Sequence, residues 1–147
     1  MKTFIGIALV AFSVMLFTAC STTARASNAP VGGNNPYAAQ PGDSTMMRGD
    51  LRIDSAGVSL AKSNPAQVML HFAYFQPTPC FSLRVEPSQP DAQNRINVSA
   101  YAVAPKDKAC TLMALATPLQ ADLNLGSFPK GHYSVWLNGA KVDEFDS

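Results

Sequence analysis

The chain has 147 residues, of which 47% are hydrophobic and 14% are charged, and its formal net charge is +1. This length suits one domain once processing is allowed for. A chain so close to neutral has no basic surface of the kind that attracts nucleic acid or anionic lipid, and we expect neither as an electrostatic partner.

The N-terminus has the pattern of a bacterial lipoprotein signal peptide. Lys2 precedes an apolar stretch over residues 4–17, which suits a signal-peptide core and is too short to span a bilayer. The small pair Thr18-Ala19 before Cys20 resembles the lipobox. This resemblance implies that residues 1–19 are removed and that Cys20 carries lipid chains that anchor the protein to a membrane. Ordinary cleavage and a retained anchor are the alternatives.

Residues 20–45 are expected to form the acylated cysteine and a flexible tether. They are rich in Ser, Thr, Ala, Asn, Gly and Pro and have almost no large apolar side chains, so they bury too little surface to offset their ordering entropy. The residue directly after Cys20 is Ser21 and not aspartate, which resembles the sorting signal of lipoproteins that are directed to an outer membrane. The expected location is therefore the extracytoplasmic side of the cell envelope, in the outer membrane if the cell has one.

From residue 46 to residue 147 the apolar side chains recur with a period of two, which indicates β-strands. The dipeptide Asn138-Gly139 is typical of a two-residue hairpin turn. Clusters of Pro, Gly, Asn and Asp separate the expected strands, which cover residues 51–60, 67–75, 81–85, 95–103, 119–125, 132–138 and 141–145. About seven short strands in one domain predict an all-β, immunoglobulin-like antiparallel sandwich.

Two further features bear on this domain. Gly131-x-Tyr133 resembles the tyrosine corner of such sandwiches, in which the tyrosine hydroxyl bonds to nearby backbone; an ordinary buried tyrosine in another β-fold is the alternative. If Cys20 is acylated, Cys80 and Cys110 remain, and two cysteines in an exported domain most often form a disulfide. A reactive or metal-binding pair is the alternative, although no histidine lies at ligand spacing beside either cysteine.

The segments PTPCFSLRV and LGSFPKGHYSVWLNGAKVDEF, with Cys110 between them, resemble a group of uncharacterised bacterial exported proteins and lipoproteins. Members of this group look like single β-sandwich domains that end in a Gly-x-Tyr-x-Val-x-x-Asn-Gly hairpin. The resemblance covers residues 46–146 and implies the fold, but it brings no activity.

The sequence has no strong catalytic or metal-binding motif. There is no Gly-x-Ser-x-Gly elbow, and His71 and His132 each lie within an alternating strand, so we expect no enzyme activity and no cofactor. Met69 and His71 are the best pair for a metal, but methionines commonly fill cores, and we predict no metal site. The tripeptide at residues 48–50, Arg-Gly-Asp, matches an integrin-binding motif, and we expect it only to solvate a strand edge.

The strand over residues 67–75 is apolar or aromatic on both faces, whereas a sandwich strand normally has one face in water. Either strand ends and loops cover the second face, or it is a contact patch. That patch would combine one strand, the following loop and an out-of-phase tryptophan: Met69, His71, Phe75, Pro77, Pro79 and Trp136.

We therefore expect a lipid-anchored, non-enzymatic binding module for an envelope protein, a glycan or an extracellular peptide. The first alternative is a structural or assembly accessory of an envelope complex. The second is a metal-handling or hydrolytic protein, and its metal form would require Met69, His71 and His132 to converge.

Overall fold

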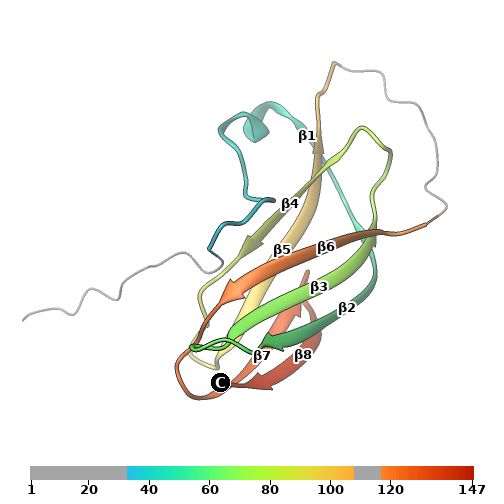
Figure 1. Ribbon diagram of the computed structural model, residues 1–147. Coiled ribbons are helices and arrows are strands. Elements are labelled where there is room, and N and C mark those ends of the chain that lie inside the picture. The colour runs from blue at the N-terminus through green and yellow to red at the C-terminus, as the bar shows by residue number, and fades with distance from the viewer. Residues whose placement is uncertain (1–32, 108–116) are drawn as a thin grey trace, which may run out of the picture.

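The computed structural model describes residues 33–107 and 117–147, and these fold into two β-sheets packed face to face (Figure 1). The elements in chain order are the 3-10 helix η1 (Pro41–Thr45) and the strands β1 (Met47–Gly49), β2 (Arg52–Ala61), β3 (Gln67–Phe75), β4 (Ser82–Pro87), β5 (Arg95–Ala104), β6 (Leu119–Gly126), β7 (His132–Leu137) and β8 (Ala140–Asp146). The predicted β-sandwich is confirmed, with the short strand β1 as an addition to the seven expected strands. Residues 1–32, including the signal-peptide segment and Cys20, lie outside the described residues, as does Cys110.

The strands divide into a five-stranded sheet and a three-stranded sheet. In the three-stranded sheet β3 lies between β2 and β6. In the five-stranded sheet β5 is central: β4 pairs along one edge, β1 and β7 share the other, and β8 follows β7. Among the pairings of the described strands only β5 with β7 is parallel, a departure from the antiparallel expectation. No helix in the described part of the chain is both long enough and apolar enough to span a membrane.

Asn138 fills the gap between the two strands that share one edge of β5. Residues 95–98 of β5 pair with β7, and residues 102–104 pair with β1. Between them, the Asn138 Nδ2 donates to the carbonyl of Ala100 (2.8 Å), and its Oδ1 accepts from the N–H of Ala100 (2.7 Å). Asn138 and Gly139 have φ values of 49° and 83°, which fit the expected two-residue turn between β7 and β8.

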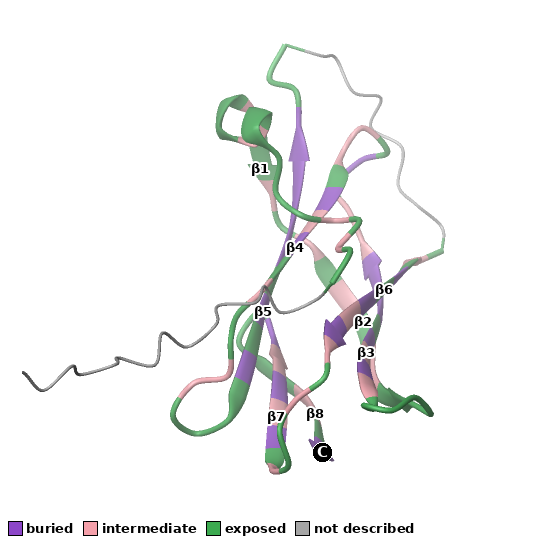
Figure 2. Cartoon of the chain, turned by 60° about the vertical axis from the view of Figure 1, so that its left-hand side comes forward, coloured by how far each residue is buried: buried purple, intermediate pink, exposed green. Residues whose placement is uncertain are grey.

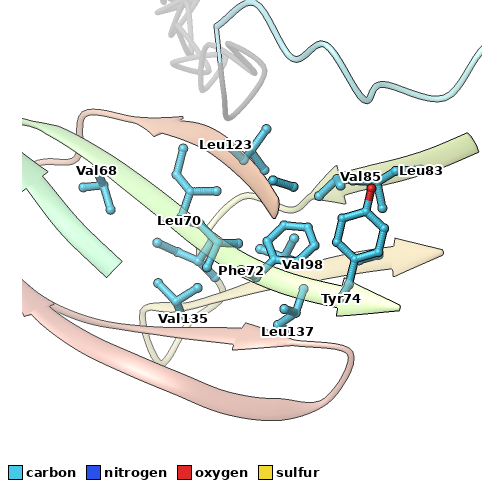
Figure 3. Packing of buried hydrophobic residues seen from close by; sticks show 14 of the residues in the cluster. Val68, Leu70, Phe72, Tyr74, Leu83, Val85, Val98, Leu123, Val135 and Leu137 are labelled. Carbon is cyan, nitrogen blue, oxygen red and sulfur yellow. The ribbon is translucent and has the colours of Figure 1, made fainter. Parts of the chain in front are cut away.

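The inner faces of the two sheets meet in a continuous apolar core (Figures 2 and 3). On β3, every second side chain from Val68 to Tyr74 points into this core, and each is at most 6% exposed. Opposite them lie Val85, Val98, Val135 and Leu137 of the five-stranded sheet (Figure 3). The alternation expected for one face of β3 is therefore present, and it leaves the other face of this strand to be explained.

Tyr133 closes one end of the core in the manner of a tyrosine corner. Its hydroxyl donates to the carbonyl of Pro129, four residues earlier, at 3.1 Å. Its ring lies 5.3 Å, between centroids, from the rings of Phe128 and Phe145. The three rings fix the connection between β6 and β7 against the end of β8.

Residues 35–45 belong to the folded domain, although the sequence predicts a tether that extends to residue 45. The Asn35 Nδ2 donates to the carbonyl of Val85 (2.8 Å), and the N–H of Val85 donates to the carbonyl of Tyr37 (2.9 Å). Farther on, Arg84 donates to both carboxylate oxygens of Asp43, at 2.6 and 3.0 Å. The segment thus covers the outer edge of β4. The unpaired N–H and C=O groups of such an edge strand can bond to any nearby segment, whatever its composition.

The pKa of Asp43 is lowered by this arrangement. The hydrogen bonds from the Arg84 side chain are the largest cause, and the backbone N–H of Gln40 adds to it. Both side chains of the pair are about one-tenth exposed, 11% for Arg84 and 10% for Asp43. A bidentate arginine–carboxylate pair of this kind has a defined geometry and holds η1 on the five-stranded sheet.

Candidate functional site

The predicted contact patch is divided between opposite faces of the sandwich. Met69, His71 and Phe75 lie on the outer face of the three-stranded sheet. Trp136 belongs to β7 of the five-stranded sheet, and the burial of its neighbour Val135 directs it to the outer face there. The expectation that Trp136 lies beside the β3 residues is therefore wrong. Periodicity placed it correctly outside the core but did not specify which sheet carries it.

Pro77 and Pro79 are both exposed in the loop that follows β3. Pro77 and the ring of Phe81 lie against Gly49, since a Cβ added to Gly49 would be 3.1 Å from Pro77 Cγ and 2.6 Å from Phe81 Cε1. This loop therefore packs on β1, and it connects β3 of the three-stranded sheet to β4 of the five-stranded sheet.

The Arg-Gly-Asp tripeptide is built into the same region. The Arg48 guanidinium lies 3.5 Å from the centroid of the Tyr101 ring, and the Tyr101 hydroxyl donates to Glu86 at 2.5 Å. Gly49 is the point of close approach to Pro77. These contacts give the tripeptide a structural role in attaching β1 to β5.

The outer face of β3 is partly covered by its own neighbours. Met69 and Phe75 are half-buried, Ala73 is buried and His71 is exposed. The guanidinium of Arg52, which pairs with Phe75 across β2 and β3, lies 4.1 Å from the Phe75 ring centroid. This face is therefore not a bare apolar patch, because a cation covers its largest ring.

His71 forms the centre of a hydrogen-bonded group on this face. Its Nε2 lies 2.6 Å from the Ser59 Oγ, and its Nδ1 lies 2.6 Å from the Asp122 Oδ1. The three side chains come from β2, β3 and β6, which are neighbours in the three-stranded sheet. Sequence reasoning missed Ser59 and Asp122. The missing information was the strand register. It sets Asp122 of β6 directly opposite His71, and it pairs His71 with Gly57 of β2, two residues before Ser59.

His132 lies on the other outer face of the sandwich. Its Nδ1 is 2.9 Å from the Asp146 Oδ1, and its Nε2 is 3.8 Å from a Glu144 oxygen. Asp146 is the largest cause that raises the pKa of His132, and Glu144 adds to it. The metal hypothesis required His71 and His132 to converge, and they lie on opposite outer faces of the sandwich instead. The described ranges hold no group of three or more metal-ligand side chains.

A groove of about 390 Å³ lies between the edge strands of the two sheets, β2 and β8. It runs between β2 and the β7–β8 hairpin, and its lining combines apolar and polar side chains: Leu51, Ile53, Asp54, Ser55, Ala56, Leu137, Asn138, Ala140, Lys141 and Val142. At one end the N–H of Val58 donates to the Asp143 Oδ2 at 3.2 Å. Peptide groups alternate in direction along a strand, so the N–H of Ala56 faces the same edge, beside the groove.

Cys80, at the entry to β4, is disulfide-bonded. The chain has three cysteines, and the other two, Cys20 and Cys110, lie outside the described residues. The predicted pairing of Cys80 with Cys110 stays a prediction.

Comparison with known proteins gives one informative result. No curated protein and no solved structure matches the chain. A family model described as the ORF11 β-sandwich domain matches residues 71–147, which run from the middle of β3 to the last residue. This matched region includes all of β4 to β8, so it accounts for the whole five-stranded sheet except β1. The chain belongs to the ORF11 β-sandwich domain family.

Proposed function

We propose that the protein is a lipid-anchored component of the cell envelope whose sandwich binds an extended peptide of another envelope protein. The groove between β2 and the β7–β8 hairpin carries this proposal, because it lies along the edge strands of both sheets. Its size is within the range of sites that bind small molecules or peptide segments. The proposal assigns no reaction to the groove.

The edge of β2 has the chemistry that an added strand needs. The N–H of Val58 already donates to an oxygen outside its own sheet, the carboxylate of Asp143. The N–H of Ala56, two residues earlier, faces the same edge next to the groove. A peptide carbonyl placed there would repeat the bond that Asp143 makes, which is the basis of strand addition at a sheet edge.

The side chains of the groove suit alternate residues of such a peptide. Leu51, Ile53 and Val142 offer apolar surface for side chains that point inward. Asp54 and Lys141 also line it and have opposite charges, and the Lys141 Nζ is paired with Glu144. A neutral peptide with apolar residues at every second position fits this lining better than a strongly charged one.

The envelope location and the anchor are the second part of the proposal. The segment over residues 1–19 has the pattern of a lipoprotein signal, and Cys20 would be the lipid-bearing first residue of the mature chain. The disulfide of Cys80 supports export, because structural disulfides persist mainly in oxidising compartments. Cys110 would be its partner, and that bridge would close a loop worth about 3–4 kcal/mol of stability.

Photo-crosslinking in intact cells tests the groove. A photoreactive phenylalanine analogue would replace Ser55 in the groove or, as the control, Gln120 on the exposed outer face of β6. We expect a peptide adduct at position 55 and not at position 120. Ala56→Pro should abolish the adduct, because proline removes the edge N–H while sparing a position that donates nothing to the β3 ladder. Equal adducts at both positions, or an adduct that persists in Ala56→Pro, would refute the groove as the binding site.

The anchor is tested by the intact mass of protein purified from membranes, measured with and without reductant. A chain that begins at an acylated Cys20 and gains two hydrogen atoms on reduction is the expected result. A Cys20→Ser variant should lose the lipid mass and leave the membrane fraction. An unacylated wild-type mass would refute the anchor without bearing on the groove.

The alternative function is that of an assembly accessory of an envelope complex. In that case a partner protein would be crosslinked at positions away from the groove.

A further inference from the structure

The hydrogen-bonded group on the outer face of the three-stranded sheet has the connectivity of an activated serine. A carboxylate only accepts hydrogen bonds, so the tautomer of His71 that fits Asp122, at 2.6 Å, has its proton on Nδ1. In that tautomer the lone pair of Nε2 faces the Ser59 hydroxyl, also at 2.6 Å. A serine whose proton points at a histidine, which a carboxylate orients in turn, is the arrangement that raises the nucleophilicity of the serine oxygen.

The strands hold this group in place and leave it accessible. His71 pairs with Asp122 across β3 and β6, and with Gly57 across β2 and β3. Gly57 has no side chain, and a Cβ built on it would meet nothing within 4 Å. The space beside His71 and next to Ser59 is therefore open to a reagent. The side chains of His71 and Asp122 are themselves 47% and 67% exposed.

We propose that Ser59 is a nucleophilic serine that takes acyl groups from activated esters. The Ser59 Oγ would attack the ester carbonyl carbon while its proton moves to the His71 Nε2. The bond from this carbon to the leaving oxygen then breaks, and His71 returns the proton to the departing alcohol. The product is an ester on Ser59, which water can hydrolyse by the same sequence, with His71 as the base.

The same structure sets the expected rate. β3 is paired on both edges, by β2 and by β6, so its N–H groups are used by the two ladders, and the outward N–H groups of β2 and β6 point along the plane of the sheet rather than above its outer face. The described residues around Ser59 thus offer the carbonyl oxygen no aligned pair of N–H donors. Such donors are worth about 10²–10³ in rate. An activated ester compensates with a good leaving group, whereas the ester on Ser59 does not, so single acylation of Ser59 is expected to outpace turnover.

The experiment uses the folded chain and p-nitrophenyl acetate. Release of nitrophenolate is followed by absorbance, and the acetylated residue is located by peptide mass spectrometry. Wild type should release about one equivalent and carry acetate on Ser59. Ser59→Ala should lose this burst, and Asp122→Asn should slow it by at least about tenfold, because the asparagine no longer fixes the tautomer of His71.

His132→Gln is the matched control, because His132 is the other exposed histidine bonded to a carboxylate. It should leave the burst unchanged. Circular dichroism would establish that each variant is folded, and all the substituted side chains, Ser59 included, are polar and exposed. Acetate found on His71 or on lysines with Ser59 unmodified, or an unchanged burst in Ser59→Ala, would overturn the proposal.

Discussion

Removal of the Asn138 side chain should separate the two strands that share one edge of β5. Its amide makes two hydrogen bonds with the backbone of Ala100, at 2.7 and 2.8 Å, and Ala100 is only 5% exposed. Each such bond contributes about 1 kcal/mol, so Asn138→Gly should lower the free energy of unfolding by about 2 kcal/mol. Glycine keeps the positive φ of this position, and the loss therefore reports the two bonds rather than the turn.

Two more substitutions distinguish the contributions. Asn138→Ala should cost about 1 kcal/mol more than Asn138→Gly, because alanine is strained at a φ of 49°. Gly139→Ala is the control: its φ is 83°, a Cβ there meets nothing within 4 Å, and no bond to Ala100 is lost. It should therefore cost only about 1 kcal/mol of backbone strain.

Urea denaturation at neutral pH measures these differences, and hydrogen exchange at the Ala100 amide locates them. We expect this amide to exchange faster in Asn138→Gly and at the wild-type rate, relative to global stability, in Gly139→Ala. A free energy of unfolding for Asn138→Gly within about 0.5 kcal/mol of wild type would refute the reasoning, since surface substitutions without a structural role fall in that range.

Three further predictions follow from single positions. Gly49→Ala should lower the urea midpoint, because its Cβ would lie 2.6 Å from an aromatic ring, whereas Gly57→Ala, with nothing within 4 Å, should not. The pKa of Asp43 is lowered, so the stability that this carboxylate contributes through Arg84 is complete above the usual carboxyl pKa of about 4 and is lost as pH falls through the lowered value. Hydrogen exchange over residues 35–45 should therefore increase in acid, and this increase should be much smaller in Asp43→Asn. The pKa of His132 is raised above its ordinary value of about 6.5, so the stability that the protonated ring contributes through Asp146 is complete below that value and is lost as pH rises through the raised pKa. An NMR titration should give a lower pKa for His132 in Asp146→Asn than in wild type.

Local patterns are sufficient to predict all the described strands of this protein except the short β1. The alternation on β3 and the turn at Asn138-Gly139 are both set within a few residues, and the structure has them where the sequence indicates. The tyrosine corner is equally local, since the Tyr133 hydroxyl reaches a carbonyl only four residues away. Such features follow from periodicity and turn chemistry, which need no knowledge of partners.

The candidate sites depend on contacts that no local pattern contains. Ser59 and Asp122 reach His71 from 12 and 51 residues away, and only the register of three strands brings them together. Trp136 was correctly placed outside the core, but its sheet depends on how the strands are shared between the two layers. The packing of residues 35–45 has another cause that composition does not reveal: the segment bonds to the backbone of Val85 and to the side chain of Arg84, both on β4 and more than 40 residues away along the chain.

Both candidate sites use β2, and this strand is irregular where they lie. Its register with β3 shifts between Ile53 and Ser55, where the strand enters the groove, and Gly57 leaves the open space opposite His71. Bulges and glycines weaken a strand, and they are found where a sheet edge must open or where another molecule must come close. No residue of β2 is fully buried, and the side chains that pack on the core from this strand, Ile53, Ala56 and Val58, are only partly buried. An edge strand with little share in the core can carry such irregularities at low cost to stability, and for that reason β2 is where binding and chemistry can be placed without disturbing the sandwich.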